Sequence, residues 1–170
     1  VAIKNVLATL PNPSEIIIIN DGSTDNTREI LSKIPEIRSF HLKRNLGQTI
    51  ALSIGIKEAK GNIIITLDGD LENDPNDIPL LLAKLHEGCD VVSGWRKNRW
   101  SKAPLTRKLP SYIANKLLSR LAGVPLHDAG CMLKVYRKNC FDIITFSGDM
   151  HRLFLIYMAK HGMRIAEIPV

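Results

Sequence analysis

The 170-residue chain lacks the features that would place it in several common protein classes. No apolar run reaches the roughly 18 residues that a membrane-spanning helix needs, and no signal peptide is evident. The three cysteines, Cys89, Cys131 and Cys140, are odd in number and have no C-x-x-C spacing. This pattern argues against a disulfide framework and against a zinc site. The simplest inference is a globular domain in a reducing compartment.

Two nucleotide-binding signatures are also missing. The chain contains no G-x-G-x-x-G, which disfavours a dinucleotide-binding fold, and no G-x-x-x-x-G-K, which disfavours a P-loop. Aromatic residues make up only 5% of the chain, and no RNA- or DNA-binding motif is present. We therefore expect no nucleic-acid partner.

Acidic residues are absent between Asp90 and Asp128, although the net charge of the whole chain is only +6. A block so one-sided predicts an anionic partner, such as phosphates, nucleic acid or an acidic membrane face, and the alternative is a solvated face. The basic residues of this block are Arg96, Lys97, Arg99, Lys102, Arg107, Lys108, Lys116 and Arg120.

Short apolar runs alternate with amphipathic stretches along the first half of the chain, which predicts an α/β fold with a mostly parallel sheet flanked by helices. After Trp95 we expect a basic loop, a helix over 107–122, a strand over 132–136, a helix over 150–160 and a strand over 164–170. We expect one domain over 1–170 that is truncated at both ends. The earlier predicted strands are 15–20, 37–42, 63–67 and 90–94, and the earlier predicted helices are 24–33, 48–59 and 75–87.

Three of the predicted strands end in polar motifs. These are Asn20-Asp21-Gly22-Ser23, Asp68-Gly69-Asp70 and Ser93-Gly94-Trp95-Arg96. In an open parallel sheet, ligands bind beyond the carboxyl ends of the strands. A carboxylate at that edge can accept hydrogen bonds from a ribose or a base, and glycine lets the backbone approach a ligand closely. Each motif can also be a plain turn.

Asp68 and Asp70 are the strongest candidate metal ligands. They are two residues apart at the end of an apolar strand, so both carboxylates can converge on one cation. Mg²⁺ is commonly held by one or two protein carboxylates, with substrate phosphates and water completing the shell. The pair therefore predicts a site for Mg²⁺ or Mn²⁺ and a phosphorylated ligand.

Several segments together resemble the inverting family 2 glycosyltransferases of the GT-A fold. They are EIIIINDGSTDNT at 15–27, NLGQ at 45–48, LDGDL at 67–71 and HDAGCMLKVYR at 127–137. The nearest likeness is to the polyprenyl-phosphate branch, similar to dolichyl-phosphate mannosyltransferase and its undecaprenyl-phosphate relatives. GDMHR at 148–152 and EIPV at 167–170 fit the same branch. The first strand of that family and its closing C-terminal segment are absent.

The resemblance implies roles for individual residues. Asp68, Asp70 and Asp128 would be catalytic, with Asp70 the direct metal ligand and Asp68 close to the ribose or sugar. Asp128 would lie near the acceptor. The residues implied in substrate binding are Asp21, Gly22, Glu72, Arg96, Arg107 and Arg152. Among these, Asp21 would contact the nucleotide, and Arg96 and Arg107 would face the phosphates. Glu72 stands where glutamine is common.

The implied reaction is metal-dependent transfer of a sugar from GDP-mannose or a UDP-hexose to a polyprenyl phosphate, with inversion. The partners would be the nucleotide sugar, the dolichyl or undecaprenyl phosphate, and an anionic membrane surface. The protein would work at the cytoplasmic face of a membrane, either peripherally or anchored by segments outside this chain. Alternatives are a nucleotidylyltransferase of similar fold, a haloacid-dehalogenase-type phosphatase, and a non-catalytic basic module that binds membrane or nucleic acid.

Overall fold

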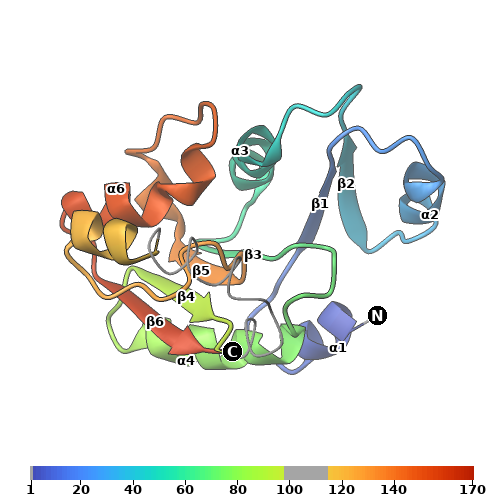
Figure 1. Cartoon of the computed structure of the whole chain (residues 1–170). Helices are drawn as coiled ribbons and strands as arrows, with labels where there is room; N and C mark the ends of the chain where they lie inside the picture. Colours follow the sequence, from blue (N-terminus) through green and yellow to red (C-terminus); the bar gives the residue numbers. More distant parts are fainter. Residues whose placement is uncertain (1, 98–114) are drawn as a thin grey trace. The chain divides into compact units, whose positions relative to one another are not determined.

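The computed structural model describes residues 2–97 and 115–170. These residues form two compact units, each with its own sheet (Figure 1). The larger unit comprises residues 2–10, 63–144 and 152–170, with the gap at 98–114, and the smaller unit comprises 11–62 and 145–151. The prediction that 1–170 is one domain stays a prediction.

A four-stranded sheet forms the centre of the larger unit. Its strands are β3 (Ile63–Thr66), β5 (Lys134–Arg137), β4 (Val91–Trp95) and β6 (Ile165–Pro169), in that spatial order. β5 pairs antiparallel with both β3 and β4, whereas β4 and β6 are parallel. Three strands therefore share one direction. Hydrophobic periodicity predicts a strand at β5 but carries no information on its reversed direction.

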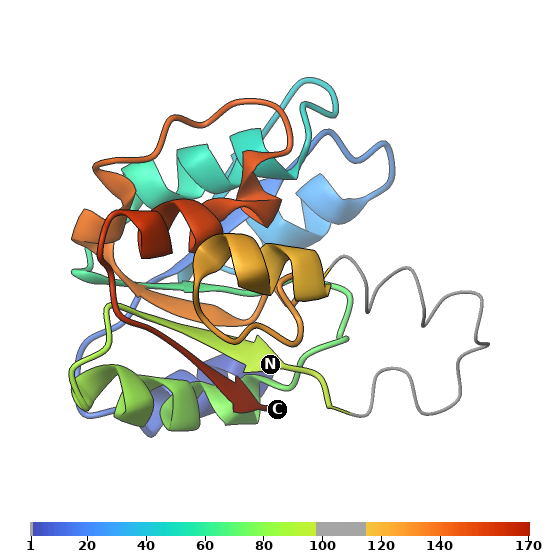
Figure 2. The same ribbon diagram turned by 60° about the vertical axis from the view of Figure 1, so that its left-hand side comes forward.

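One face of this sheet is covered by α4 (Ile78–His86) and α1 (Ala2–Ala8) (Figure 2). The α4 helix is preceded by a 3₁₀ turn, η1 (Pro75–Asp77). Asp74 caps that turn, because its Oδ1 accepts a hydrogen bond from the Asn76 N–H at 2.9 Å. The buried side chains between helices and sheet are Val6, Ile78, Leu81, Leu85, Val92, Cys131, Leu133 and Val135.

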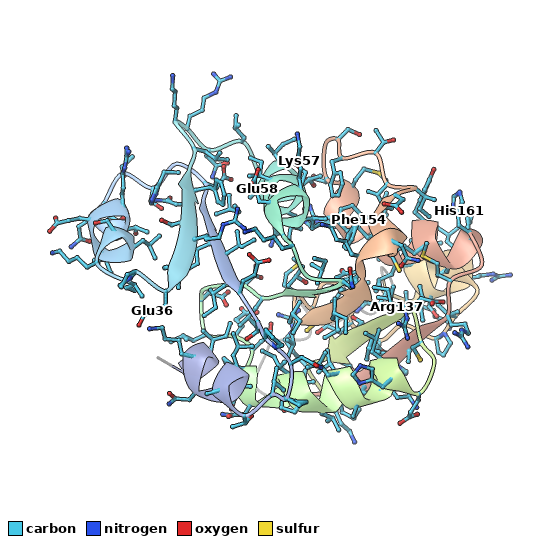
Figure 3. All side chains as sticks on the ribbon, turned by 180° about the vertical axis from the view of Figure 1, so that it is seen from behind. Glu36, Lys57, Glu58, Arg137, Phe154 and His161 are labelled. Atoms are coloured by element: carbon cyan, nitrogen blue, oxygen red, sulfur yellow. The ribbon has the colours of Figure 1, made fainter. Side chains whose placement is uncertain are left out.

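The opposite face packs against η2 (Lys138–Phe141), which follows β5, and against α6 (Phe154–Lys160) (Figure 2). Tyr136 on β5 contacts Phe141 with ring centroids 4.8 Å apart. Phe141 in turn meets the edge of Phe154, labelled in Figure 3, at 5.9 Å. This aromatic row and the aliphatic core of the other face make the sheet a rigid platform, because side chains of β-strands alternate between the two faces.

The smaller unit is built on a parallel pair of strands, β1 (Ile16–Asn20) and β2 (Ile37–His41). Its helices are α2 (Thr27–Ser32) and α3 (Gln48–Glu58). Residues 145–151 are tied to α3 by a hydrogen bond of 2.8 Å between Thr49 Oγ1 and His151 Nδ1. The short η3 turn (Met150–Arg152) precedes α6.

The predicted elements are present in the described residues, with ends displaced by up to four residues, the largest displacement being at the start of α6, where the separate η3 turn takes the place of the first predicted residues. Residues 115–122 are helical, which supports the end of the helix predicted at 107–122. The loop expected after Arg96 and the start of that helix, with Arg107, lie outside the described residues. None of the helices in the described part of the chain has the length and apolar character to cross a bilayer.

Candidate functional site

The candidate site is the carboxyl edge of the four-stranded sheet. β3 and β4 both run antiparallel to β5, so their carboxyl ends meet at the same edge. The Asp68-Gly69-Asp70 motif follows β3, and Arg96 follows β4 directly. Two of the three strand-end motifs of the sequence therefore lie at one edge. The third, which contains Asp21, belongs to the smaller unit.

The loop after β3 carries the predicted metal ligands. Asp68 is half-buried and Asp70 is exposed. The Glu72 N–H donates to Asp70 Oδ1 at 3.0 Å, which closes a tight turn. At its tip Leu71 has a φ of 64° and is 88% exposed. A non-glycine residue in this left-handed region is uncommon. The backbone preference of Leu71 therefore does not by itself explain the conformation of this loop.

The donor set of this loop suits a hard divalent cation that is shared with phosphate. Mg²⁺ and Mn²⁺ prefer carboxylate and phosphate oxygens, and one or two protein carboxylates suffice when a ligand supplies the remainder. Asp68 and Asp70 fit that requirement. Within 2–97 and 115–170, no group of three or more His, Cys, Asp or Glu side chains could hold a metal without such a ligand.

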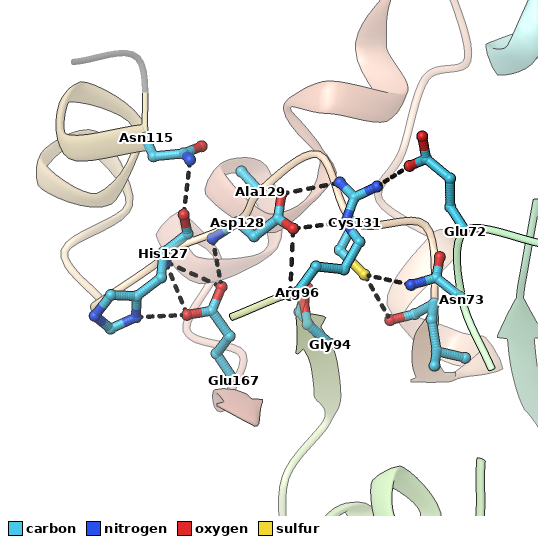
Figure 4. Close-up of polar contacts among 12 residues, drawn as sticks. Glu72, Asn73, Gly94, Arg96, Asn115, His127, Asp128, Ala129, Cys131 and Glu167 are labelled. Carbon is cyan, nitrogen blue, oxygen red and sulfur yellow. Dashed lines mark hydrogen bonds and ion pairs between the residues drawn. The ribbon is translucent and has the colours of Figure 1, made fainter. Parts of the chain in front are cut away.

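Arg96 is the most tightly held charged side chain at this edge (Figure 4). Its Nε donates to Asp128 Oδ2 at 2.7 Å, and its Nη2 donates to Asp128 Oδ1 at 3.1 Å. Its Nη1 pairs with Glu72 Oε2. The Arg96 side chain is only 9% exposed and that of Asp128 10%. The two-pronged bond sets the plane of the guanidinium group, because both prongs must be coplanar with the carboxylate.

The charge of Arg96 is fixed by its surroundings. Burial alone lowers the pKa of Arg96, but the hydrogen bonds and the negative charge of Asp128 outweigh it, so the pKa lies above its ordinary value. Glu72 adds to the same effect. The predicted substrate residue Glu72 therefore lies on the predicted phosphate-binding arginine, where it occupies one of the N–H groups that could bind phosphate.

A fully buried cation supports the turn that carries Asp128. Lys134 on β5 donates from Nζ to the Ala129 carbonyl at 3.2 Å and to the Cys131 carbonyl. Burial lowers the pKa of Lys134 to about 8, although the charges of Asp128 and Asp68 oppose that shift. The ammonium group therefore satisfies two carbonyls of residues 129–131, which would otherwise be buried without donors.

Close packing also fixes the end of β4. A Cβ added to Gly94 would lie 3.0 Å from the Leu133 carbonyl oxygen and 3.2 Å from Cys131 Sγ. Cys131 itself is buried and accepts a hydrogen bond from Asn73 Nδ2 at 3.4 Å. Glycine before Trp95 therefore lets β4 approach β5 closely, immediately before the chain reaches Arg96.

Asp21 and Gly22 have a different setting in the smaller unit. Asp21 Oδ1 accepts from the Leu46 N–H at 2.7 Å, and Oδ2 accepts from the Gly47 N–H at 2.9 Å. Gly22 has a φ of 77°, and a Cβ there would lie 2.4 Å from the Arg44 carbonyl carbon. Both residues thus shape the 44–47 loop, which contains part of the N-L-G-Q motif. Their predicted contact with a nucleotide stays a prediction.

Of the remaining predicted residues, Arg107 lies outside the described residues, and Arg152 ends the η3 turn with its side chain exposed. Sequence reasoning did not single out Lys134, and it noted Glu167 only as part of a motif. A charged residue between apolar neighbours was the available signal. Glu167 interrupts Ile165-Ala166 and Ile168, and Lys134 stands between Leu133 and Val135.

Comparison with known proteins identifies the family of the chain. Residues 1–144 match the model of the family described as "Glycosyl transferase family 2". The chain belongs to this family. The predicted α/β class of GT-A type is also confirmed, because the solved structures of similar fold cover almost the whole chain. The chain is therefore a family 2 domain.

Two curated relatives of this family 2 domain are polyprenyl-phosphate sugar transferases by name. Dodecaprenyl-phosphate galacturonate synthase of Rhizobium johnstonii is 42% identical over 96% of this chain and 51% of its own length. Undecaprenyl-phosphate 4-deoxy-4-formamido-L-arabinose transferase of Klebsiella pneumoniae is 38% identical over the same shares. The chain spans about half the length of these relatives.

Among solved structures, glucosyl-3-phosphoglycerate synthase of Mycobacterium tuberculosis, in complex with Mn²⁺, UDP-glucose and phosphoglyceric acid, aligns with a TM-score of 0.74. The alignment covers 99% of this chain and 64% of that chain at 18% identity. At this identity the likeness concerns the fold of the family 2 domain and not its substrates.

Proposed function

We propose that this family 2 domain transfers a sugar from a nucleotide-sugar donor to a polyprenyl phosphate, with inversion at the anomeric carbon. The observation that carries the proposal is the fixed guanidinium of Arg96 at the sheet edge where the Asp68-Gly69-Asp70 loop follows β3. An oriented arginine and a pair of carboxylates suit phosphate and its counter-cation. The named relatives at 42% and 38% identity supply the acceptor class.

The reaction forms a bond between a phosphate oxygen of the acceptor and the anomeric carbon. The bond between that carbon and the donor diphosphate breaks, and the diphosphate leaves with the bonding electron pair. A phosphate monoester has a second pKa near 6 and is largely ionised at neutral pH. The nucleophile therefore needs no strong general base. The task of the protein is to hold two phosphate groups and to stabilise the charge that develops on the leaving group.

Arg96 is suited to the second task. Its guanidinium group keeps its charge and its orientation before substrate binds, and a preorganised charge costs little reorganisation during the reaction. Asp128 acts here through Arg96, which it holds by two hydrogen bonds. In this assignment Arg96 faces a phosphate and Asp128 sets the direction in which it faces.

Asp70, with Asp68, would hold Mg²⁺ or Mn²⁺. When bound, the cation supplies positive charge to the diphosphate as a Lewis acid. The exposed position of Asp70 leaves its carboxylate accessible to such a cation. We propose the same two carboxylates for either ion, because both ions accept oxygen ligands.

The acceptor places the working protein at an anionic membrane surface. Lys116 and Arg120 on the helical residues 115–122 are exposed, and exposed Leu117 and Leu121 lie on the same helix. Each basic side chain near anionic lipid contributes about 1 kcal/mol. We propose the cytoplasmic face, with peripheral attachment or an anchor elsewhere in the protein.

The proposal is tested with the full-length protein, undecaprenyl phosphate in mixed micelles and a panel of radiolabelled UDP- and GDP-sugars. We expect lipid-linked sugar and free nucleoside diphosphate with Mn²⁺ or Mg²⁺, and loss of product after chelation. The D70N variant should lose at least about 100-fold in kcat/KM. D74N is the matched control, because asparagine keeps the helix cap and Asp74 lies outside the site.

Two results would contradict the proposal. One is release of pyrophosphate instead of a nucleoside diphosphate, which marks a nucleotidylyltransferase. The other is D70N turnover equal to that of D74N, which would remove the metal assignment. Tight DNA binding without any nucleotide-sugar binding would instead support a non-catalytic basic module.

A further inference from the structure

A buried carboxylate on β6 has no task in the reaction described above. Glu167 is 4% exposed, yet it lies on an otherwise apolar strand. We infer that Glu167 is a positioning residue, which fixes the His127-Asp128 backbone so that Asp128 can hold Arg96 in its phosphate-binding orientation. This inference rests on the proposed function, since it concerns the same arginine.

Three N–H groups converge on this one carboxylate (Figure 4). The His127 backbone N–H lies 2.8 Å from Oε2 and 3.0 Å from Oε1, and the Asp128 backbone N–H donates to Oε1 at 2.9 Å. His127 Nδ1 lies 2.7 Å from Oε2. Two consecutive backbone amides can point at one acceptor only when the backbone between them takes a narrow range of angles. Glu167 thereby sets the conformation of the turn at Asp128.

The sheet holds Glu167 in register for this contact. β6 lies parallel to β4, with Glu167 opposite Ser93 and Pro169 opposite Trp95. The indole ring of Trp95 stacks on the His127 imidazole, with centroids 4.2 Å apart and planes inclined by 20°. Trp95 at the end of β4 and Glu167 on β6 thus both contact His127. The conformation of the turn is therefore set by the sheet and not by the turn residues alone.

A chain of contacts then leads from Glu167 to the candidate phosphate site. Glu167 fixes the Asp128 backbone, Asp128 fixes the Arg96 guanidinium through two bonds, and Arg96 presents its Nη1 edge towards the loop that contains Glu72. Replacing the carboxylate by an amide leaves one oxygen acceptor for the two backbone donors of His127 and Asp128. One backbone N–H would then lose its partner. The turn would gain alternative conformations in which Asp128 no longer accepts hydrogen bonds from both Nε and Nη2 of Arg96.

The experiment compares E167Q with D90N in the full-length protein. Asp90 is the matched control, because its Oδ2 also accepts a backbone N–H across the β4–β6 pair, from Arg164 at 2.8 Å, but at the opposite end of the strands. We expect E167Q to lower kcat/KM for sugar transfer by on the order of 10- to 100-fold, the usual cost of a lost hydrogen bond to a charged group. D90N should stay within about twofold.

A double-mutant cycle separates positioning from general stability. If Glu167 acts only through Asp128, then E167Q in a D128N background should cost no more than about a further twofold. The effects of D90N and D128N on kcat/KM should add in the double variant. The affinity for UDP and GDP, measured by calorimetry without turnover, should show the same pattern, because the phosphate-binding orientation is lost in either single variant. If E167Q does not fold, E167D, which keeps the charge, takes its place in the cycle.

The outcomes distinguish this inference from the proposed function. Full additivity of E167Q and D128N, or an E167Q protein within twofold of the unaltered one, overturns the positioning role while sugar transfer still stands. If the unaltered protein binds the diphosphate but transfers no sugar, the proposed function falls, and the cycle in binding affinity still decides the role of Glu167.

Discussion

Asp21 directly follows β1, and Asp128, from the turn before β5, lies beside the end of β4, but the two aspartates bind different partners. Asp21, after β1, accepts hydrogen bonds from two backbone N–H groups of the 44–47 loop. Asp128, beside the end of β4, accepts two bonds from a guanidinium group. A carboxylate bound to backbone amides shapes the chain. A carboxylate bound to an arginine determines where a positive charge points.

This difference affects how strand-end acids should be interpreted. Asp21 follows a strand directly, where ligands are expected beyond the carboxyl ends of strands, whereas Asp128 reaches the end of β4 from the turn before β5. Only the β4 end combines a fixed cation, a nearby acidic loop and a buried second carboxylate. At the β1 end, both oxygens of Asp21 already have backbone donors. At the β4 end the carboxylates therefore fix the charge of Arg96, whereas at the β1 end the carboxylate fixes the backbone of the 44–47 loop.

The sharpest test of the charged end is R96K. Lysine keeps the positive charge but cannot form the planar two-pronged bond with Asp128. We expect kcat/KM for sugar transfer to fall by on the order of 10²- to 10³-fold, as for the loss of an oriented catalytic donor. K97Q is the control, since Lys97 is the exposed neighbour and lies 6.0 Å over the Trp95 ring. An R96K variant within about twofold of the unaltered protein, together with a larger loss in K97Q, would mean that net charge matters and orientation does not.

The loop-shaping end is tested most severely by G22A. The new Cβ would meet the Arg44 backbone at 2.4 Å, and φ is +77°. Strain and overlap together should cost about 3 kcal/mol, which corresponds to roughly 100-fold faster amide exchange of residues 42–48. G47A shares a positive φ of 91° but meets nothing within 4 Å, so it should cost only about 1 kcal/mol. Similar exchange rates in the two variants would show that close approach is not the reason for glycine at position 22.

The sequence predicts the strands of the site but not the contacts between its side chains, for physical reasons that differ from residue to residue. The apolar runs at 16–19 and 63–65 predict strands correctly, although residues 16–19 and two of the three residues of 63–65 are only half-buried, and Asp74 caps η1. The pairing of Arg96 with Asp128 could not be read, since 32 residues separate them and nothing local links them. The sequence marks Glu167 only as a charged residue within an apolar strand, and its partners become visible once β6 is known to lie beside β4. Strand direction and strand neighbours are tertiary facts, and the core of this site depends on both.

A milder change at the β1 end is D21N, which separates loop shaping from nucleotide contact. Asparagine retains one acceptor oxygen, so one of the Leu46 and Gly47 amides loses its partner. The loss should accelerate exchange of those amides by about tenfold, from roughly 1.5 kcal/mol for a charged hydrogen bond. The measurement is residue-resolved hydrogen exchange, with nucleoside diphosphate affinity determined in parallel. If affinity falls while exchange is unchanged, Asp21 contacts the nucleotide directly, and the two strand ends are more alike than their hydrogen bonds indicate.

The smallest effect is expected for E72Q, and its direction is the informative part. Glu72 pairs with Arg96 Nη1 and is 49% exposed, so the pair is partly solvent-screened and is worth about 1 kcal/mol or less. Any phosphate that binds Arg96 through this edge must displace Glu72. Removing the negative charge should therefore tighten nucleoside diphosphate binding by about two- to fivefold, and the gain should shrink as salt is raised.

Calorimetry with UDP and GDP at two ionic strengths measures this change in affinity, with E87Q as a control, since Glu87 pairs with Lys84 on α4. Weaker binding in E72Q would mean that Glu72 itself contributes to holding the ligand, for example through the cation. In that case Glu72 would be a third functional carboxylate at the β4 end, beside Asp128 and Glu167.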